Sequence, residues 1–386
     1  MAKLPLNLEG KLEKRRKGNA FRTLSPISDL VDFSSNDYLG FSREKRIAEM
    51  ANEQVARLQP FQNGATGSRL LSGNHGFYGE LEDFISSFHH SPAALIFNSG
   101  YDANLGFFSS VPQRGDIVLY DEYCHASIRD GIKLGPSKSY KFKHNSLGDL
   151  ASHLKRSRKV HGENPTIYVV TESVFSMDGD SPNLAEFAAL VVDNGALLVV
   201  DEAHAMGIYG KGLMNTLGLE DNVFARIITF GKALGTHGAV ILGNPGLRDF
   251  LINFCRSFIY TTALPLHTLA TIWAAYRFFD SEQGRQRQQA LTDNIGYFKS
   301  LIVQKGLNMY FSESSSAVQV CRIGGNDQTK KLSSVLKEAG FDVRPILNPT
   351  VPQGEERLRF CLHAFNTGNE MESVLTMVKK HMLNEE

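Results

Sequence analysis

The sequence predicts an α/β fold in which a mostly parallel central sheet is covered by helices and is followed by a smaller C-terminal α+β domain. From about residue 90, short β-rich apolar runs alternate with helical stretches. Near-continuous apolar strands separated by helices are typical of a sheet that is buried on both faces. After about residue 275 this alternation gives way to a polar helix and short strands, which indicates a second domain.

Strands and helices follow one another through the expected α/β region. The strands are expected at Ala93–Phe97, Ile117–Tyr120, Thr166–Thr171, Ala196–Val200, Arg226–Phe230 and Ala239–Leu242. The helices are expected at Tyr101–Ser110, Ala126–Leu134, Leu147–Arg156 and Leu184–Asn194. Ligands of such sheets bind beyond the carboxyl ends of the strands, so functional residues are expected there.

The flanking segments complete three predicted parts: an N-terminal segment (1–45), a large domain (46–275) and a small C-terminal domain (276–386). The charged run from Lys11 to Lys17 predicts a solvated helix near the N-terminus. A long helix is expected at Thr268–Phe279, and short strands are expected at Ser316–Arg322 and Arg357–Leu362. No repeat or low-complexity tract interrupts this order.

Composition excludes several classes of protein. The 386 residues contain 41 basic and 41 acidic side chains, so no overall field favours nucleic acid or an anionic membrane. No apolar stretch reaches the roughly 18 residues that a membrane helix needs, and Met1 to Gly18 lacks the apolar core of a signal peptide. The four cysteines stand far apart, which is typical of buried, reduced thiols. We therefore expect a cytoplasmic protein without a metal site.

An acid and a histidine follow the strand Ala196–Val200, in the order Asp201-Glu-Ala-His204. A carboxylate at the end of a buried strand is costly unless a cation pairs with it, and a protonated pyridine nitrogen is such a cation. His204 could then reach a phenolic oxygen attached to that ring. The same letters spell a helicase box, but the phosphate loop GxxxxGK[ST] that a helicase needs is absent from the chain. A plain alternative is that Asp201 caps the next turn.

One lysine stands in a loop of small residues after another strand, in the order Thr229-Phe-Gly-Lys232-Ala-Leu-Gly235. A lysine amine is the nucleophile that forms a Schiff base with an aldehyde. Small neighbours let a flat cofactor approach the backbone, and the Thr229 hydroxyl suits a phosphate oxygen. The alternative is a solvated lysine between two strands.

Three further strand ends carry polar groups. Gly100 and Tyr101 open a helix, and the positive end of a helix favours an anion. His125 could stack on a planar ring and move a proton, or could simply cap the next helix. Ser176 could donate a hydrogen bond to a cofactor. Together, these strand ends supply the groups that a phosphorylated pyridine aldehyde needs.

The chain resembles the α-oxoamine synthases, which are fold type I pyridoxal-phosphate (PLP) transferases. The motifs that carry the resemblance, beyond Asp201–His204 and Thr229–Lys232, are Ser34-Ser-Asn36-Asp-Tyr-Leu-Gly40, Gly67-Ser-Arg-Leu-Leu-Ser-Gly73, His125-Ala-Ser127, Phe175-Ser176-Met-Asp-Gly179, Pro349-Thr350-Val-Pro352 and Arg357-Leu-Arg359. They span nearly the whole chain in the family's order. Tyr78 departs from the pattern, since many relatives have a histidine there.

The resemblance implies how the site works. Lys232 holds PLP as a Schiff base and, once freed, removes the Cα proton of the amino acid. Asp201 keeps the ring nitrogen protonated, and His125 stacks on the ring. The residues expected to bind the cofactor are Gly100, Tyr101, His125, Ser176, Asp201, His204, Thr229 and Lys232, and the catalytic ones are Lys232, His125, Asp201 and His204.

The resemblance also implies the substrates. Within the family, the motifs favour the branch of biotin synthesis that joins L-alanine to a pimeloyl thioester, carried by coenzyme A or by an acyl-carrier protein. Arg359, Asn36 and Thr350 are expected to bind the amino acid, and Arg22 the far carboxylate of the pimeloyl chain. An alternative within the family joins glycine to acetyl-CoA. The resemblance further implies a homodimer with its active sites at the interface.

Overall fold

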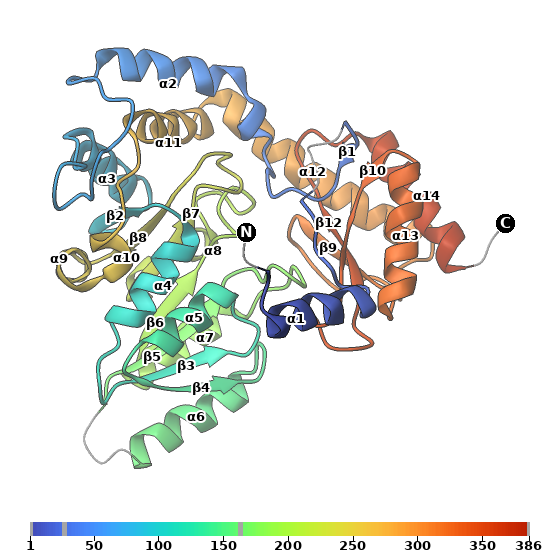
Figure 1. The fold of residues 1–386 in the computed structure, drawn as a ribbon, viewed down its shortest axis with the longest axis horizontal. Coiled ribbons are helices and arrows are strands. Elements are labelled where there is room, and N and C mark those ends of the chain that lie inside the picture. The colour runs from blue at the N-terminus through green and yellow to red at the C-terminus, as the bar shows by residue number, and fades with distance from the viewer. Residues whose placement is uncertain (1–2, 25–28, 161–164, 384–386) are drawn as a thin grey trace. The chain divides into compact units, whose positions relative to one another are not determined.

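The computed structural model describes residues 3–24, 29–160 and 165–383 (Figure 1). Their packing divides the chain into two compact units. The large unit comprises Asn36–Ser176 and Asp180–Thr292, and the small unit comprises Met1–Ser35, Met177–Gly179 and Asp293–Glu386. The chain thus changes unit after residues 35, 176, 179 and 292, whereas the domain limits expected from the sequence, after residues 45 and 275, stay a prediction.

The large unit contains a seven-stranded sheet with the strand order β2-β8-β7-β6-β5-β3-β4. Its strands are β2 (Ala93–Phe97), β3 (Ile117–Asp121), β4 (Lys138–Phe142), β5 (Ile167–Glu172), β6 (Leu197–Asp201), β7 (Ala225–Thr229) and β8 (Ala239–Gly243). Only β8 runs antiparallel to its neighbours within this sheet. The predicted fold class is confirmed. The edge strand β4 was not expected, because most of its side chains are exposed and polar and it lacks an apolar run.

Helices cover both faces of this sheet. Consecutive residues of one strand, such as Val118 and Leu119 of β3, belong to two different apolar cores. The reason is that successive side chains of a strand point to opposite faces of the sheet. One core includes α4 (Gly100–Ser110), α5 (Ala126–Leu134) and α9 (Pro245–Phe254). The other includes α6 (Leu147–Val160) and α7 (Leu184–Asp193). This two-faced burial explains the near-continuous apolar strands.

Further helices of the large unit lie outside this alternation. The helices α2 (Lys45–Arg57) and α11 (Leu266–Phe279) pack against each other, although they lie far apart in the sequence (Figure 1). The elements are η1 (Phe41–Arg43), α2 (Lys45–Arg57), α3 (Phe77–Phe88), α8 (Leu213–Thr216), η2 (Glu220–Asn222), α10 (Arg256–Ile259) and α11 (Leu266–Phe279). The predicted long helix corresponds to α11.

The small unit is built around an antiparallel sheet with the order β11-β12-β9. Its strands are β9 (Val318–Arg322), β11 (Arg344–Ile346) and β12 (Arg357–Cys361), and β1 (Val31–Asp32) pairs with β10 (Phe341–Asp342). Its helices are α1 (Leu6–Lys17), α13 (Asn326–Glu338) and α14 (Gly368–Met382), and α12 (Glu282–Gln304) runs from the large unit into the small one. As expected, α1 buries no side chain.

The cysteines agree with the expectation of buried, reduced thiols. Each of the four cysteines is buried and free. No helix in the described ranges is long and apolar enough to span a membrane. Within the same ranges, no group of His, Cys, Asp and Glu side chains is arranged to hold a metal ion.

Candidate active site

A cavity lies at the carboxyl ends of β5, β6 and β7, beside the first residues of α4 and α5. It is lined by residues of the large unit, and its volume is about 170 Å³. Pockets for drug-sized ligands are typically larger, so this cavity suits a small ligand. Among the residues lining it are most of those predicted to bind a cofactor: Gly100, Tyr101, His125, Asp201, His204, Thr229 and Lys232.

Asp201 ends β6 and is held by donors from two elements. Its Oδ2 accepts a hydrogen bond from Asn104 Nδ2 on α4 at 2.8 Å, and its Oδ1 accepts one from the backbone N–H of Ala203 at 2.8 Å. The second bond caps the following turn, which is the alternative role that the sequence predicted for Asp201. The side chain nevertheless lines the cavity and is only 5% exposed. Asp201 thus combines the capping role with a position facing a ligand.

The carboxyl group of Glu172 lies on the neighbouring strand end. Glu172 of β5 is the direct register partner of Asp201 in the parallel pair β5–β6. Its Oε1 accepts a hydrogen bond from the backbone N–H of His125 at 2.6 Å. Burial and the charge of Asp201 raise the pKa of Glu172 above its ordinary value. Two buried carboxyl groups therefore share this edge of the cavity.

His125 caps α5 and also lines the cavity. Its Nδ1 accepts a hydrogen bond from the Ser127 backbone N–H at 3.3 Å and lies 2.8 Å from Ser127 Oγ. Burial lowers the pKa of His125, and Lys232 adds to this effect, although Asp201 opposes it. A neutral imidazole that accepts at Nδ1 carries its proton on Nε2.

A short chain of hydrogen bonds ties His204 to the start of the large unit. Its Nδ1 lies 2.7 Å from the hydroxyl of Tyr38, and that hydroxyl donates to Asn36 Oδ1 at 3.2 Å. His204 is only 4% exposed, so these contacts fix its ring within the cavity wall. Asn36 itself does not line the cavity, and it is connected to the cavity through Tyr38.

Lys232 stands in the tight connection between β7 and β8. The Lys232 carbonyl accepts from Gly235 N at 2.8 Å, and Gly235 has a φ of 62°, which a glycine adopts without strain. Thr229 Oγ1 accepts from Gly231 N at 3.3 Å. The start of α4 lies close to the end of β7, since a Cβ added at Gly100 would be in van der Waals contact with Thr229 Cβ at 3.4 Å.

Comparisons with known proteins identify the family. A profile of the class I and II aminotransferases matches residues 28–378. The chain belongs to the class I and II aminotransferase family. The 8-amino-7-oxononanoate synthase of Emericella nidulans is 42% identical to it over 92% of this chain and 90% of that protein. These matches confirm the family resemblance found in the sequence.

Solved structures share the fold of this chain. A serine palmitoyltransferase variant from S. paucimobilis, solved with a bound PLP–myriocin aldimine, has a TM-score of 0.87 and 26% identity, covering 98% of this chain and 97% of that one. The 8-amino-7-oxononanoate synthase of Francisella tularensis has a TM-score of 0.76 and 27% identity, covering 92% and 98%. Both matches cover nearly the whole chain, in agreement with the predicted fold type I architecture.

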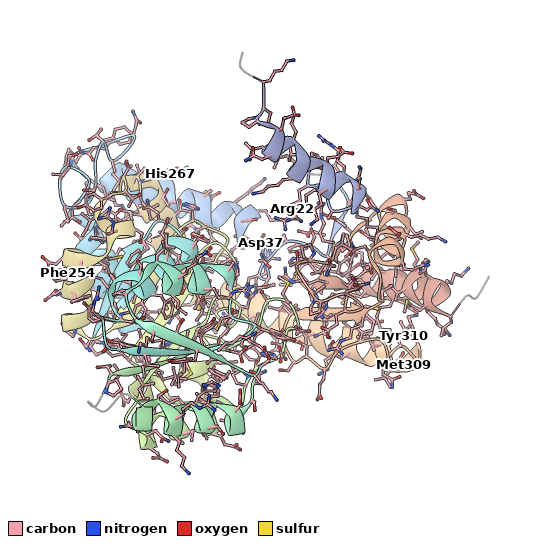
Figure 2. The ribbon with its side chains drawn as sticks, turned by 60° about the horizontal axis from the view of Figure 1, so that its bottom comes forward. Arg22, Asp37, Phe254, His267, Met309 and Tyr310 are labelled. Carbon is pink, nitrogen blue, oxygen red and sulfur yellow. The ribbon has the colours of Figure 1, made fainter. Side chains whose placement is uncertain are left out.

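Some of the predicted site residues are not part of the cavity. Ser176 is half-buried and does not line it. Arg22, Thr350 and Arg359 belong to the small unit, whereas the cavity is built from the large unit. Arg22 is exposed (Figure 2), Thr350 is exposed, and Arg359 lies half-buried in β12. Their binding roles therefore stay predictions.

Sequence reasoning missed five residues that line the cavity: Asn104, Ser127, Glu172, Ala203 and Ile227. Asn104 Nδ2 donates both to Asp201 and to Ser127 Oγ, which lies 3.1 Å away, and so joins Asp201 to the His125 cap. One signal was available for Asn104, because it follows Gly100 by four residues and therefore lies on the same helix face. Glu172 ends a strand as Asp201 does, which was an equally visible signal.

Proposed function

We propose that this protein is a PLP-dependent acyltransferase that condenses L-alanine with a pimeloyl thioester. The products are 8-amino-7-oxononanoate, carbon dioxide and the free thiol. The observation that carries the proposal is the meeting of Lys232, Asp201, His125 and His204 in one small cavity at the strand ends. The relatives named 8-amino-7-oxononanoate synthase support the choice of reaction.

The cavity fits PLP by the chemistry of its wall. It combines a lysine for the aldehyde, a buried carboxylate for a protonated ring nitrogen, and a helix start for the phosphate. Asn104 Oδ1 is buried and has no hydrogen-bond partner in the described part of the chain. A ligand bound beside Asp201 could therefore donate a hydrogen bond to this oxygen. Gly100, Tyr101 and Thr229 would hold the phosphate, and Lys232 the aldehyde carbon.

Bound PLP supplies a conjugated ring that withdraws electrons from the Cα of the amino acid. Asp201 would hold a proton on the ring nitrogen, and Asn104 and Ala203 N orient that carboxylate. His125, neutral and with its proton on Nε2, would lie against the ring face. His204, oriented by Tyr38, would form a hydrogen bond with the phenolic oxygen of the cofactor, and we assign the same oxygen to Ser176.

The Lys232 amine, once free, would take the proton from Cα of alanine. A bond then forms between Cα and the thioester carbonyl carbon, and the C–S bond breaks as the thiol leaves with a proton. The carboxylate leaves as carbon dioxide, and Cα is reprotonated. For the substrates we assign Arg359, Asn36 and Thr350 to the alanine carboxylate and Arg22 to the far carboxylate of the pimeloyl chain.

We also propose that the protein works as a homodimer in the cytoplasm and takes its acyl group from coenzyme A or an acyl-carrier protein. Large apolar side chains are exposed on the large unit: Phe254 at the end of α9 (Figure 2) is 60% exposed, and Tyr260 is 73% exposed. Exposed apolar surface of this kind supports an oligomer. Sedimentation of the purified protein at micromolar concentration is expected to give twice the mass of the chain.

An assay of purified protein with PLP tests the reaction. Alanine, glycine and serine are crossed with pimeloyl-CoA and acetyl-CoA, and release of the thiol is followed. We expect alanine with pimeloyl-CoA to be the best pair, and Arg22→Ala to raise KM for pimeloyl-CoA without changing KM for acetyl-CoA. A preference for glycine with acetyl-CoA would replace the proposal by the alternative reaction of the same family.

A further inference from the structure

Glu172 and Asp201 present two carboxyl groups to one edge of the cavity. They end adjacent parallel strands in direct register, and they are 3% and 5% exposed. Both line the cavity. The proposed reaction uses Asp201 and gives no task to Glu172, so the second carboxyl group needs its own explanation.

The two carboxyl groups receive different partners. Asp201 accepts hydrogen bonds from the Asn104 side chain and from Ala203 N, whereas Glu172 accepts one from His125 N. The ion pairs found among the described residues do not include Glu172, and the charge of Lys232 favours its ionised form less than burial and Asp201 disfavour it. A buried carboxylate without a cation is strongly disfavoured, and a second negative charge beside it adds to the cost.

Glu202 gives the opposite case a short distance away. It is fully buried, and its Oε2 lies 2.6 Å from Arg226 Nη2 and accepts from Arg226 Nε at 2.7 Å. Its Oε1 accepts from the backbone N–H of Met214 at 2.9 Å. The carboxyl group of Glu202 therefore has a guanidinium partner inside the fold. Glu172 has a backbone N–H and a neighbouring aspartate instead.

The charged and titratable groups around Glu172 come from four elements. Asp201 of β6 and Asp121 of β3 disfavour its ionised form, and Lys232 of the β7–β8 loop favours it. Cys124 and His125, which precede α5, complete the surroundings. Burial is the largest effect and raises the pKa of Glu172, and the backbone bond from His125 opposes it only in part.

We propose that Glu172 works as a neutral carboxylic acid that positions His125 and leaves Asp201 as the single negative charge facing the ring nitrogen. The side-chain oxygen Oε1 of Glu172 accepts from the backbone N–H of His125 and so holds His125 at the edge of the cavity. Its proton removes the repulsion that a second carboxylate would exert on Asp201. The neutral state of Glu172 and its hydrogen bond to His125 are properties of the protein itself. The effect on Asp201 facing the ring nitrogen depends on the proposed function.

Infrared spectroscopy of the protein without cofactor tests the protonation directly. The wild type at pH 7 is expected to show a protonated carboxyl C=O band that is missing from Glu172→Gln. Glu202→Gln is the matched control, because it removes an equally buried glutamate that is paired with Arg226 and should remove a carboxylate band instead. Glu172→Ala should lose the same acid band as Glu172→Gln. Loss of a carboxylate band in both Glu172 variants would overturn the proposal.

Activity tests the functional part. At pH 7, Glu172→Gln keeps a neutral acceptor for His125 N and should retain activity within about threefold, whereas Glu172→Ala leaves that N–H unsatisfied and should lose roughly tenfold or more. As pH rises through the raised pKa of Glu172, the wild type should lose activity while Glu172→Gln does not. Equal losses in both variants at every pH would show a structural role alone. If no substrate pair reacts, the infrared result still stands.

Discussion

At the scale of single residues, two donors orient the side chain of Asp201 towards the cavity. Asn104 and Ala203 N both donate to its carboxylate. Asp201→Asn keeps the shape and removes the charge, so PLP should still bind while turnover falls by roughly 100- to 1,000-fold, because the proton on the ring nitrogen is lost.

Measurement of kcat with alanine, together with PLP affinity by absorbance, checks this prediction. Asp249→Asn on the surface of α9, where the side chain is 64% exposed, is the control and should be silent. Near-normal turnover in Asp201→Asn would remove the assigned role of this carboxylate.

The sequence left two roles open for Asp201 and for His125, and the structure shows why. Asp201 could be a cap or a ligand for a ring, and His125 could be a cap or a stacking group. Both side chains cap the next turn and also line the cavity. One polar side chain can accept a hydrogen bond from the backbone of the next turn and still face the cavity, so the two interpretations are compatible.

At the scale of elements, the β7–β8 connection that carries Lys232 depends on Gly235. Its φ of 62° suits glycine, and a Cβ there would collide with the backbone of Phe41 and Ser42. Gly235→Ala should therefore lower the free energy of unfolding by roughly 2 kcal/mol or more. It should also weaken PLP binding, because the lysine moves with its loop.

Gly79→Ala provides the matched control in urea denaturation. Gly79 lies in α3 with open space around its missing Cβ. This substitution should stabilise the protein by about 0.5–1 kcal/mol, since alanine is the better helix former. If both variants are equally stable, the constraint on the lysine loop is absent.

His144 links the ends of β3 and β4 to the segment that follows β5. Its Nδ1 lies 2.9 Å from Asp121 Oδ1 and its Nε2 lies 2.8 Å from Asp180 Oδ2. Burial alone would lower the pKa of His144, but these two bonds outweigh burial and raise the pKa to about 10. The folded state therefore binds this proton more tightly than the unfolded state does.

A raised histidine pKa stabilises the fold fully below the unfolded value of 6.5, and the benefit fades as pH rises towards about 10. His144→Gln should cost roughly 2 kcal/mol at pH 6 and clearly less at pH 10. Urea denaturation at both pH values measures the difference, with His153→Gln as a control whose carboxylate partner is 3.9 Å away. A cost that grows with pH would contradict the assigned charge.

The sequence predicted elements well where burial imposes a pattern. Strands β2, β3, β5, β6, β7 and β8 were expected within one residue of their ends, because both of their faces are covered. The edge strand β4 was missed because four of its five residues are exposed. The expectation for α1 held because a helix without buried residues reads as charged all round.

At the scale of the whole molecule, the order of the chain and its packing differ. Met177–Gly179 belongs to the small unit, although the residues on either side belong to the large one. Asp178 pairs with Arg357, and Ser314 Oγ donates to the Gly179 carbonyl at 2.7 Å, both within the small unit. Local periodicity carries no signal for such long-range contacts. Ser176, directly before this segment, was expected in the cavity for its motif and lies outside its wall.

Recognition of motifs gave the family and the cofactor, and the structure gave the partners of each residue. The Asn104–Ser127–His125 connection and the register of Glu172 with Asp201 depend on packing between distant segments. Neither follows from spacing along the chain.

The central claim is a covalent bond between Lys232 and PLP, and reduction with borohydride tests it most directly. The protein is loaded with PLP, reduced, digested and mapped by mass spectrometry, with Lys232→Ala and Lys211→Ala treated in parallel. The account predicts the cofactor on the peptide containing Lys232 in the wild type and in Lys211→Ala, and no label in Lys232→Ala. A label on another lysine, or none in the wild type, would contradict it.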